Sequence, residues 1–324
     1  MTDPATVAAL QAENARLIKV LQNHGIEWRL PPPTVLVTRE PEISRLSTAE
    51  KEALFRRLFR GRTDVYPIRW EGKTSGKSGY APACANEWRA GVCEKPRIKC
   101  GDCSNRLLIP LSDAVIYDHL AGEHTVGVYP LLEDDSCHFL ATDFDEADWR
   151  EDARAYMQSC DELGVPVAIE ISRSGQGAHA WVYFASRVSA RDARRLGTAI
   201  ISHTCSRTRQ LKLESYDRLF PNQDTMPKGG FGNLIALPLQ KWPRERGCSV
   251  FVDAELRPYP DQWAFLASVA PMAVHDIEST ILRATGGVHP LDVTFIDDED
   301  LARTGSGRAR RRRSWPGRCP SRSA

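Results

Sequence analysis

The chain has 324 residues, of which 42% are hydrophobic and 26% are charged, as is typical of a soluble globular protein. Its net charge of +1 is unevenly distributed, because residues 303–324 contain eight Arg and no acidic residue. The first 302 residues therefore hold 35 basic and 42 acidic groups, a net charge of −7, and any nucleic acid must be held by local patches or by the C-terminal segment. No apolar run approaches the ~18 residues of a membrane span, and the N-terminus lacks a secretory pattern, so we expect a cytoplasmic protein.

The first 80 residues predict two helices. Residues 5–24 form the first, with Leu10, Leu17 and Leu21 at coiled-coil spacing, which suggests weak dimerisation. A breaker-rich linker follows, and a capping box over residues 47–50 then begins a second helix, which is expected to end at residue 61. Residues 72–78 resemble a phosphate-binding P-loop but have three residues between the glycines instead of four. They also follow no clear apolar strand and precede no helix, so we expect a basic flexible loop there.

Four of the nine cysteines cluster in the next segment: Cys84, Cys93, Cys100 and Cys103. The last two have the spacing of a zinc knuckle, and the first two complete a four-thiolate zinc site. The alternative is a loop with four free thiols, whereas a disulfide does not suit a reducing cytosol. Basic residues around the cysteines could contact a phosphate backbone, although a purely structural zinc explains the pattern equally well. These residues are Arg89, Lys95, Arg97, Lys99 and Arg106.

After a predicted helix near 112–122 and a strand over 126–132, a strand over 137–145 ends in two acidic residues, Asp143 and Asp145. Alternate residues of a strand share a face, so the two carboxylates project together, while Thr142 and Phe144 point the other way. Two carboxylates at the end of an apolar strand are costly unless a cation lies between them, and paired divalent ions are common in phosphoryl transfer. The alternative is an ordinary strand that continues into an acidic turn.

A glycine-rich turn over residues 172–179 follows a predicted helix (146–163) and strand (165–171). Its glycines allow a sharp turn and close approach to a ligand. Arg173, Ser174 and the turn amides could hold phosphate oxygens, and His179 begins the next strand on the same face as Trp181 and Tyr183. A plain hairpin is the alternative, but it needs neither the polar residues before the turn nor the histidine after it.

The rest of the chain predicts a helix over 189–208, a strand over 234–239 and helices over 260–285. Strands alternating with helices, together with a hairpin, predict an α+β fold with a sheet layer and helices on one side. The segment after residue 286 is acidic and then rich in Arg, with no apolar period, and is not expected to fold.

Together these motifs resemble the archaeo-eukaryotic primase superfamily over roughly residues 45–270, and most closely its branch in TOTE conflict systems, related to CRISPR-associated primase-polymerases. The segments that carry the resemblance are the Asp-Phe-Asp strand, Ser172–Trp181, Ser215–Asp224 and Gly229–Gln240. The resemblance implies an RRM-like sheet beside a second αβ unit. The zinc knuckle would be inserted in this core or precede it, after a short N-terminal helix.

The resemblance also implies the roles of the site residues. Asp143 and Asp145 would be the first two metal ligands, and His179, with Arg173 and Ser174, would bind the nucleotide triphosphate. Asp217 is chosen as the third ligand, although Glu214 and Asp224 lie nearby in sequence. The implied cofactors are two Mg²⁺ or Mn²⁺ ions, in addition to the structural zinc.

The protein is thus expected to be a primase or primase-polymerase that acts on a nucleic-acid template with NTP or dNTP, any unwinding or nuclease activity coming from a separate chain. The alternatives are a zinc-containing nucleic-acid-binding module with an inactive site and a metal-dependent phosphodiesterase. The predicted organisation is an N-terminal helix (1–30), a helix with the four-cysteine segment (31–110), a catalytic domain (111–285) and a tail (286–324).

Overall fold

The computed structural model describes residues 4–24, 44–72, 76–145, 148–207 and 215–286. The chain divides into two units, residues 1–40 and 41–324. The first contains α1 (Pro4–Asn23), close to the predicted helix, with Leu17 47% exposed. Dimerisation through this helix stays a prediction, as do the other domain boundaries. The linker after residue 24 and the tail from residue 287 lie outside the described residues.

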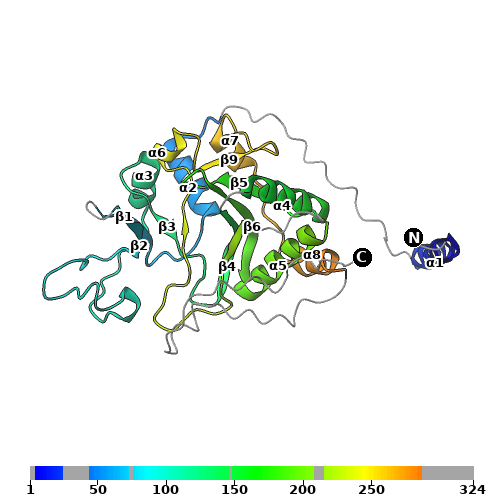
Figure 1. Ribbon diagram of the computed structural model, residues 1–324, viewed down its shortest axis with the longest axis horizontal. Coiled ribbons are helices and arrows are strands. Elements are labelled where there is room, and N and C mark those ends of the chain that lie inside the picture. The colour runs from blue at the N-terminus through cyan, green and yellow to red at the C-terminus, as the bar shows by residue number, and fades with distance from the viewer. Residues whose placement is uncertain (1–3, 25–43, 73–75, 146–147, 208–214, 287–324) are drawn as a thin grey trace. The chain divides into compact units, whose positions relative to one another are not determined.

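A five-stranded sheet forms the centre of the second unit (Figure 1). Its order is β7–β4–β6–β5–β9, and every neighbouring pair is antiparallel. The strands are β4 (Ser136–Asp145), β5 (Ala168–Ile171), β6 (Gly177–Ser189), β7 (Tyr216–Phe220) and β9 (Val250–Val252). The two longest, β4 and β6, lie next to each other, so the predicted Asp-x-Asp strand and the histidine strand are direct neighbours.

Helices cover one face of this sheet: α4 (Trp149–Leu163), α5 (Ala190–Arg207) and α8 (Asp276–Ala284) (Figure 1). Thr142 on β4 points toward α4, where its hydroxyl lies 3.0 Å from that of Tyr156. The residue alternation predicted for β4 is therefore present, with Thr142 and Phe144 on the helix side.

The prediction of helices on one side only is wrong. Phe59, directly after α2 (Thr48–Leu58), packs its ring edge-on against Trp181 at 5.0 Å on the opposite face. The physical reason is that Trp181 and Tyr183 are bulky and apolar and must also be buried, so a second layer covers part of that face.

The predicted capping box of α2 is present, since the Ser47 hydroxyl accepts from the amide of Glu50 and the Glu50 carboxylate accepts from that of Ser47. Gly61 serves close packing and does not end the helix. A Cβ there would lie 2.4 Å from the carbonyl oxygen of Tyr129, so only glycine lets the two backbone segments approach.

Two antiparallel strands, β1 (Pro67–Glu71) and β2 (Ser78–Pro82), flank the P-loop-like segment, of which residues 73–75 lie outside the described residues. A strand therefore precedes this segment. The sequence analysis did not predict it, because residues 67–71 contain no apolar run. A second strand follows instead of a helix, so the segment is not a P-loop.

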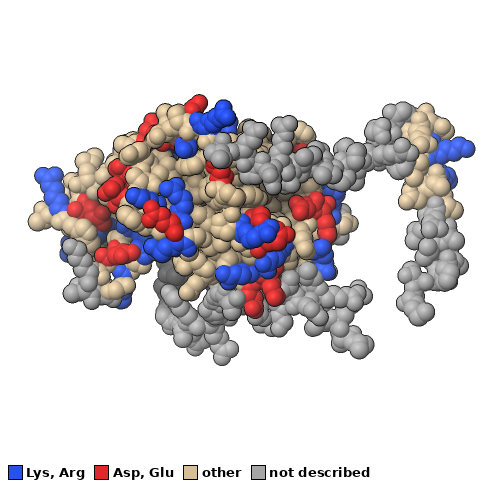
Figure 2. Space-filling view, turned by 90° about the horizontal axis from the view of Figure 1, so that it is seen from above, with Lys and Arg blue, Asp and Glu red and all other residues tan. Residues whose placement is uncertain are grey.

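The remaining described elements are a second two-stranded sheet and four short helices. A short ladder pairs β3 (Gly127–Val128) with β8 (Ile235–Ala236), both much shorter than predicted. The helices are η1 (Cys100–Asp102), α3 (Asp113–Ala121), α6 (Lys241–Arg244) and α7 (Gln262–Ser268). On the face shown in Figure 2, acidic and basic side chains lie next to one another, and no broad patch has a single sign.

Candidate active site

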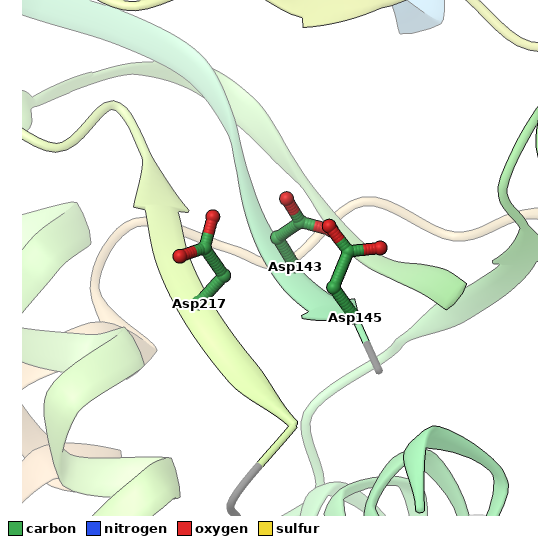
Figure 3. A group of neighbouring side chains, drawn as sticks. All are labelled: Asp143, Asp145 and Asp217. Atoms are coloured by element: carbon green, nitrogen blue, oxygen red, sulfur yellow. The ribbon is translucent and has the colours of Figure 1, made fainter. Parts of the chain in front are cut away.

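Three carboxylates converge at one end of the sheet (Figure 3). Asp143 and Asp145 extend from the end of β4, and Asp217 extends from the neighbouring strand β7. One carboxylate oxygen from each residue lies within 4.8 Å of the other two. An oxygen cluster of this size suits a hard divalent cation.

An irregularity in the pairing of β4 with β7 brings Asp217 to this cluster. Thr142 is opposite Leu219, but Phe144 is opposite Tyr216, so Asp217 and Arg218 share the position opposite Asp143. An extra residue of this kind redirects a side chain. In a regular register Asp217 would be opposite Phe144, whose side chain faces the helices.

The alternatives for the third carboxylate differ from Asp217 in the structure. Asp224 forms an ion pair with Arg194 at 2.6 Å and is not part of the cluster. Glu214 lies outside the described residues. The geometry therefore favours Asp217, and its role as a ligand stays a prediction.

The carboxylates repel one another. The pKa of Asp143 is raised to about 6, first by burial and then by the charges of Asp145 and Asp217, although His179 and Arg218 act in the opposite direction. A cation between the carboxylates would offset this cost, so the residues present fit a divalent metal ion.

His179 lies on β6 directly opposite Asp143. Its Nε2 is 3.5 Å from Oδ1 of Asp143, and its Nδ1 is 2.9 Å from Oε2 of Glu170 on β5. Burial alone would lower the pKa of His179, but Glu170, Asp143 and Asp145 raise it to about 9. The ring is therefore protonated at neutral pH, and Nε2 can donate a hydrogen bond into the site.

The glycine-rich turn packs directly on the carboxylates. A Cβ on Gly177 would lie 2.5 Å from Oδ1 of Asp145, so no other residue fits there without displacement. The Ser174 hydroxyl lies 3.0 Å from that of Ser172 and accepts from the amide of Gln176. Burial raises the pKa of the Tyr80 phenol in β2 and the positive charge of Arg173 acts in the opposite direction, which shows that this strand lies near the turn. Arg173 and Ser174 are thus beside the site, and their binding of phosphate stays a prediction.

The four clustered cysteines line one small pocket. The amide of Leu107 donates to Sγ of Cys84 at 3.3 Å. Within the described part of the chain, no three of these sulfur atoms lie within 4.8 Å of one another, whereas sulfurs around one zinc are about 3.8 Å apart. The donor set suits zinc, but the side chains must move closer together to bind it.

Some of the basic residues around the cysteines already form hydrogen bonds or ion pairs within the protein. Arg106 donates to the carbonyl oxygens of Gly101 and Gly229, and Lys95 pairs with Glu87 at 2.6 Å. Arg106 therefore joins the cysteine segment to the loop after β7, a structural role that its sequence position did not reveal.

Sequence reasoning missed Glu170 and Arg218. Glu170 is an isolated acidic residue in the apolar strand Ala168–Ile171. A buried carboxylate needs a hydrogen-bond partner, so this pattern could have indicated that Glu170 has one. No comparable signal marked Arg218, because its place depends on the register of β7.

The chain combines a mixed helix-and-sheet fold with three carboxylates that could hold a metal ion, as in primases of nucleotidyltransferase type. A model of the archaeo-eukaryotic primase domain of TOTE conflict systems matches residues 50–280, and the chain belongs to this family. No curated protein matches the chain.

Among solved structures, the chain is similar to the polymerase domain of Mycobacterium tuberculosis ligase D in complex with DNA. The identity is 13%, the match covers 81% of this chain and 96% of that one, and the TM-score is 0.32, too low to support any inference about this chain. Within the described residues, no helix is long and apolar enough to span a membrane.

Proposed function

We propose that this protein is a metal-dependent, template-directed nucleotidyltransferase that makes or extends a nucleic-acid primer. The observation that carries the proposal is the convergence of Asp143, Asp145 and Asp217 beside His179, in a chain of the primase family. The three aspartates supply oxygen ligands for Mg²⁺ or Mn²⁺. Two such ions, when bound, lower the pKa of an attacking hydroxyl and neutralise the charge that develops on pyrophosphate.

The protein's own residues bind and orient the nucleotide. Nε2 of His179 faces the carboxylate cluster and can donate to a triphosphate oxygen. We assign Ser174 and Arg173 to the same phosphates, and the packing of their turn against Asp145 supports this assignment. The template is a nucleic acid held by local contacts, since the first 302 residues carry a net charge of −7.

Primer extension tests this function. The full chain is incubated with a primed template, Mg²⁺ or Mn²⁺, and either ribo- or deoxyribonucleotides. Lengthening of the primer that requires the metal supports the proposal, whereas shortening would indicate a phosphodiesterase. Template binding without any change in primer length would indicate a binding module.

A structural zinc is the second part of the proposal. Its support is that Cys84, Cys93, Cys100 and Cys103 line one pocket and that an amide donates to Cys84. The segment contains few large apolar residues, so a metal would supply much of its folding free energy.

A further inference from the structure

Glu170 is a buried carboxylate that the proposed chemistry does not use. Its side chain is 2% exposed, in the middle of β5. A buried charge is costly unless its hydrogen bonds are satisfied. Glu170 meets this condition with three donors: Nδ1 of His179 at 2.9 Å and Nε1 of Trp181 at 3.0 Å, both on Oε2, and the Ser249 hydroxyl at 3.4 Å on Oε1.

The sheet register explains why Glu170 meets His179. His179 is directly opposite Asp143 on one side and directly opposite Glu170 on the other, so the three residues form a row across β4, β6 and β5. Residues directly opposite in antiparallel strands lie on the same face within contact distance. The imidazole is therefore held between two carboxylates, with Nδ1 toward the core and Nε2 toward the site.

A hydrogen bond at one ring nitrogen is enough to fix the orientation of a histidine ring. The bond from Nδ1 to Glu170 prevents the ring from turning over and leaves Nε2 as the nitrogen that faces Asp143 at 3.5 Å. The donor from Trp181 to the same oxygen keeps the Glu170 carboxylate itself in place.

We propose that Glu170 is a positioning residue for nucleotide binding: it accepts the hydrogen bond from Nδ1 of His179 and so presents Nε2 to the triphosphate. This inference rests on the proposed function, because it assigns the triphosphate to His179. Glu170 itself touches neither the aspartate cluster nor the nucleotide.

The test uses Glu170→Gln, which keeps the side-chain volume and weakens the bond to Nδ1. We expect the Kd and KM for dATP or ATP to rise about tenfold, with kcat changed by less than about threefold. In a His179→Gln background, Glu170→Gln should have no further effect on nucleotide affinity, because its effect acts through the ring. An additive effect would overturn the proposal.

Ser249→Ala is the matched control, because it removes a hydrogen bond from the other oxygen of Glu170 and leaves the one that holds His179. Nucleotide affinity should stay within about twofold of the parent. An equal loss in this variant would mean that Glu170 acts only through the packing of the core.

Nuclear magnetic resonance of the histidine nitrogens separates this inference from the proposed function, since it needs neither nucleotide nor activity. The Nδ1–H of His179 should give an exchange-protected proton signal that shifts and exchanges faster in Glu170→Gln. An unchanged signal would overturn the positioning role alone. A parent protein that binds neither dATP nor ATP would overturn the proposed function and the nucleotide part of this inference with it.

Discussion

At the scale of single residues, the site depends on three carboxylates that the chain brings together from two strands. Asp143→Ala, Asp145→Ala and Asp217→Ala each remove one of the proposed metal ligands, so we expect primer synthesis to fall by orders of magnitude, while template binding persists. Primer extension and a gel-shift assay measure the two effects.

The control for this prediction is Asp224→Ala, whose carboxylate pairs with Arg194 away from the cluster and should be dispensable for synthesis. Glu214→Ala completes the set. Normal synthesis by Asp217→Ala together with its loss in either of the other two variants would show that the third ligand is misassigned.

His179 is assigned to phosphate and not to metal, so its replacement should give a different kinetic pattern. His179→Gln is expected to raise the KM for the triphosphate more than it lowers kcat, because a ground-state contact is lost. Steady-state extension kinetics at varied nucleotide concentration measure this. A large loss of kcat at unchanged KM would place His179 in the chemical step instead.

At the scale of elements, His119 joins α3 to two other segments. It is fully buried, its Nδ1 accepts from the amide of Val126 at 3.2 Å, and its Nε2 lies 2.9 Å from the carbonyl oxygen of Pro238. Both contacts are satisfied by the neutral ring with its proton on Nε2. Burial lowers the pKa of His119 from 6.5 to about 4.

This shift predicts a pH dependence of stability. Between pH 6.5 and about 4, His119 binds a proton in the unfolded chain but not in the folded chain. The contribution of His119 to the free energy of unfolding is therefore fully present above pH 6.5 and is lost as the pH falls toward 4. The loss amounts to about 3 kcal/mol at most. Thermal unfolding at stepped pH should show a shallower decline in His119→Asn, whereas His275→Asn, at an exposed histidine, should follow the parent. Equal slopes in all three proteins would contradict the assignment.

The cysteine segment gives a second prediction at this scale. Cys100→Ser should abolish zinc binding and destabilise residues 80–106, since metal binding and folding are coupled in such segments. Metal analysis and hydrogen exchange measure the two effects, with Cys205→Ser as a control outside the segment. Zinc-free purified protein whose stability is unaffected by a chelator would rule out the site.

At the scale of the whole molecule, charge is separated along the chain. The eight Arg of residues 303–324 change the net charge from −7 to +1. Deletion of these residues should reduce the slope of log K for nucleic acid against log salt, through lost counterion release, and leave the catalytic step nearly intact. Fluorescence anisotropy across a salt series measures the slope. Collapse of turnover on saturating template would show that the segment belongs to the folded enzyme.

The local features of the site can be predicted from the sequence alone. Strand alternation over residues 137–145 placed Asp143 and Asp145 on one face, and the same period placed His179 with Trp181, because side-chain direction in a strand depends only on position along the chain. The capping box of α2 was equally local. The short strands β1, β7 and β9 were missed, since three to five residues without a clear period carry little signal.

Contacts between residues far apart in the sequence depend on the tertiary fold. Asp217 reaches the cluster through the irregular pairing of β7 with β4, and Glu170 meets His179 through the register of β5 with β6. Register between strands far apart in sequence is set by packing of the whole sheet, and a shift of one residue turns a side chain to the other face. A linear pattern does not contain that information, so the sequence indicated the chemistry of this site while the fold selected its third carboxylate and the partner of its histidine.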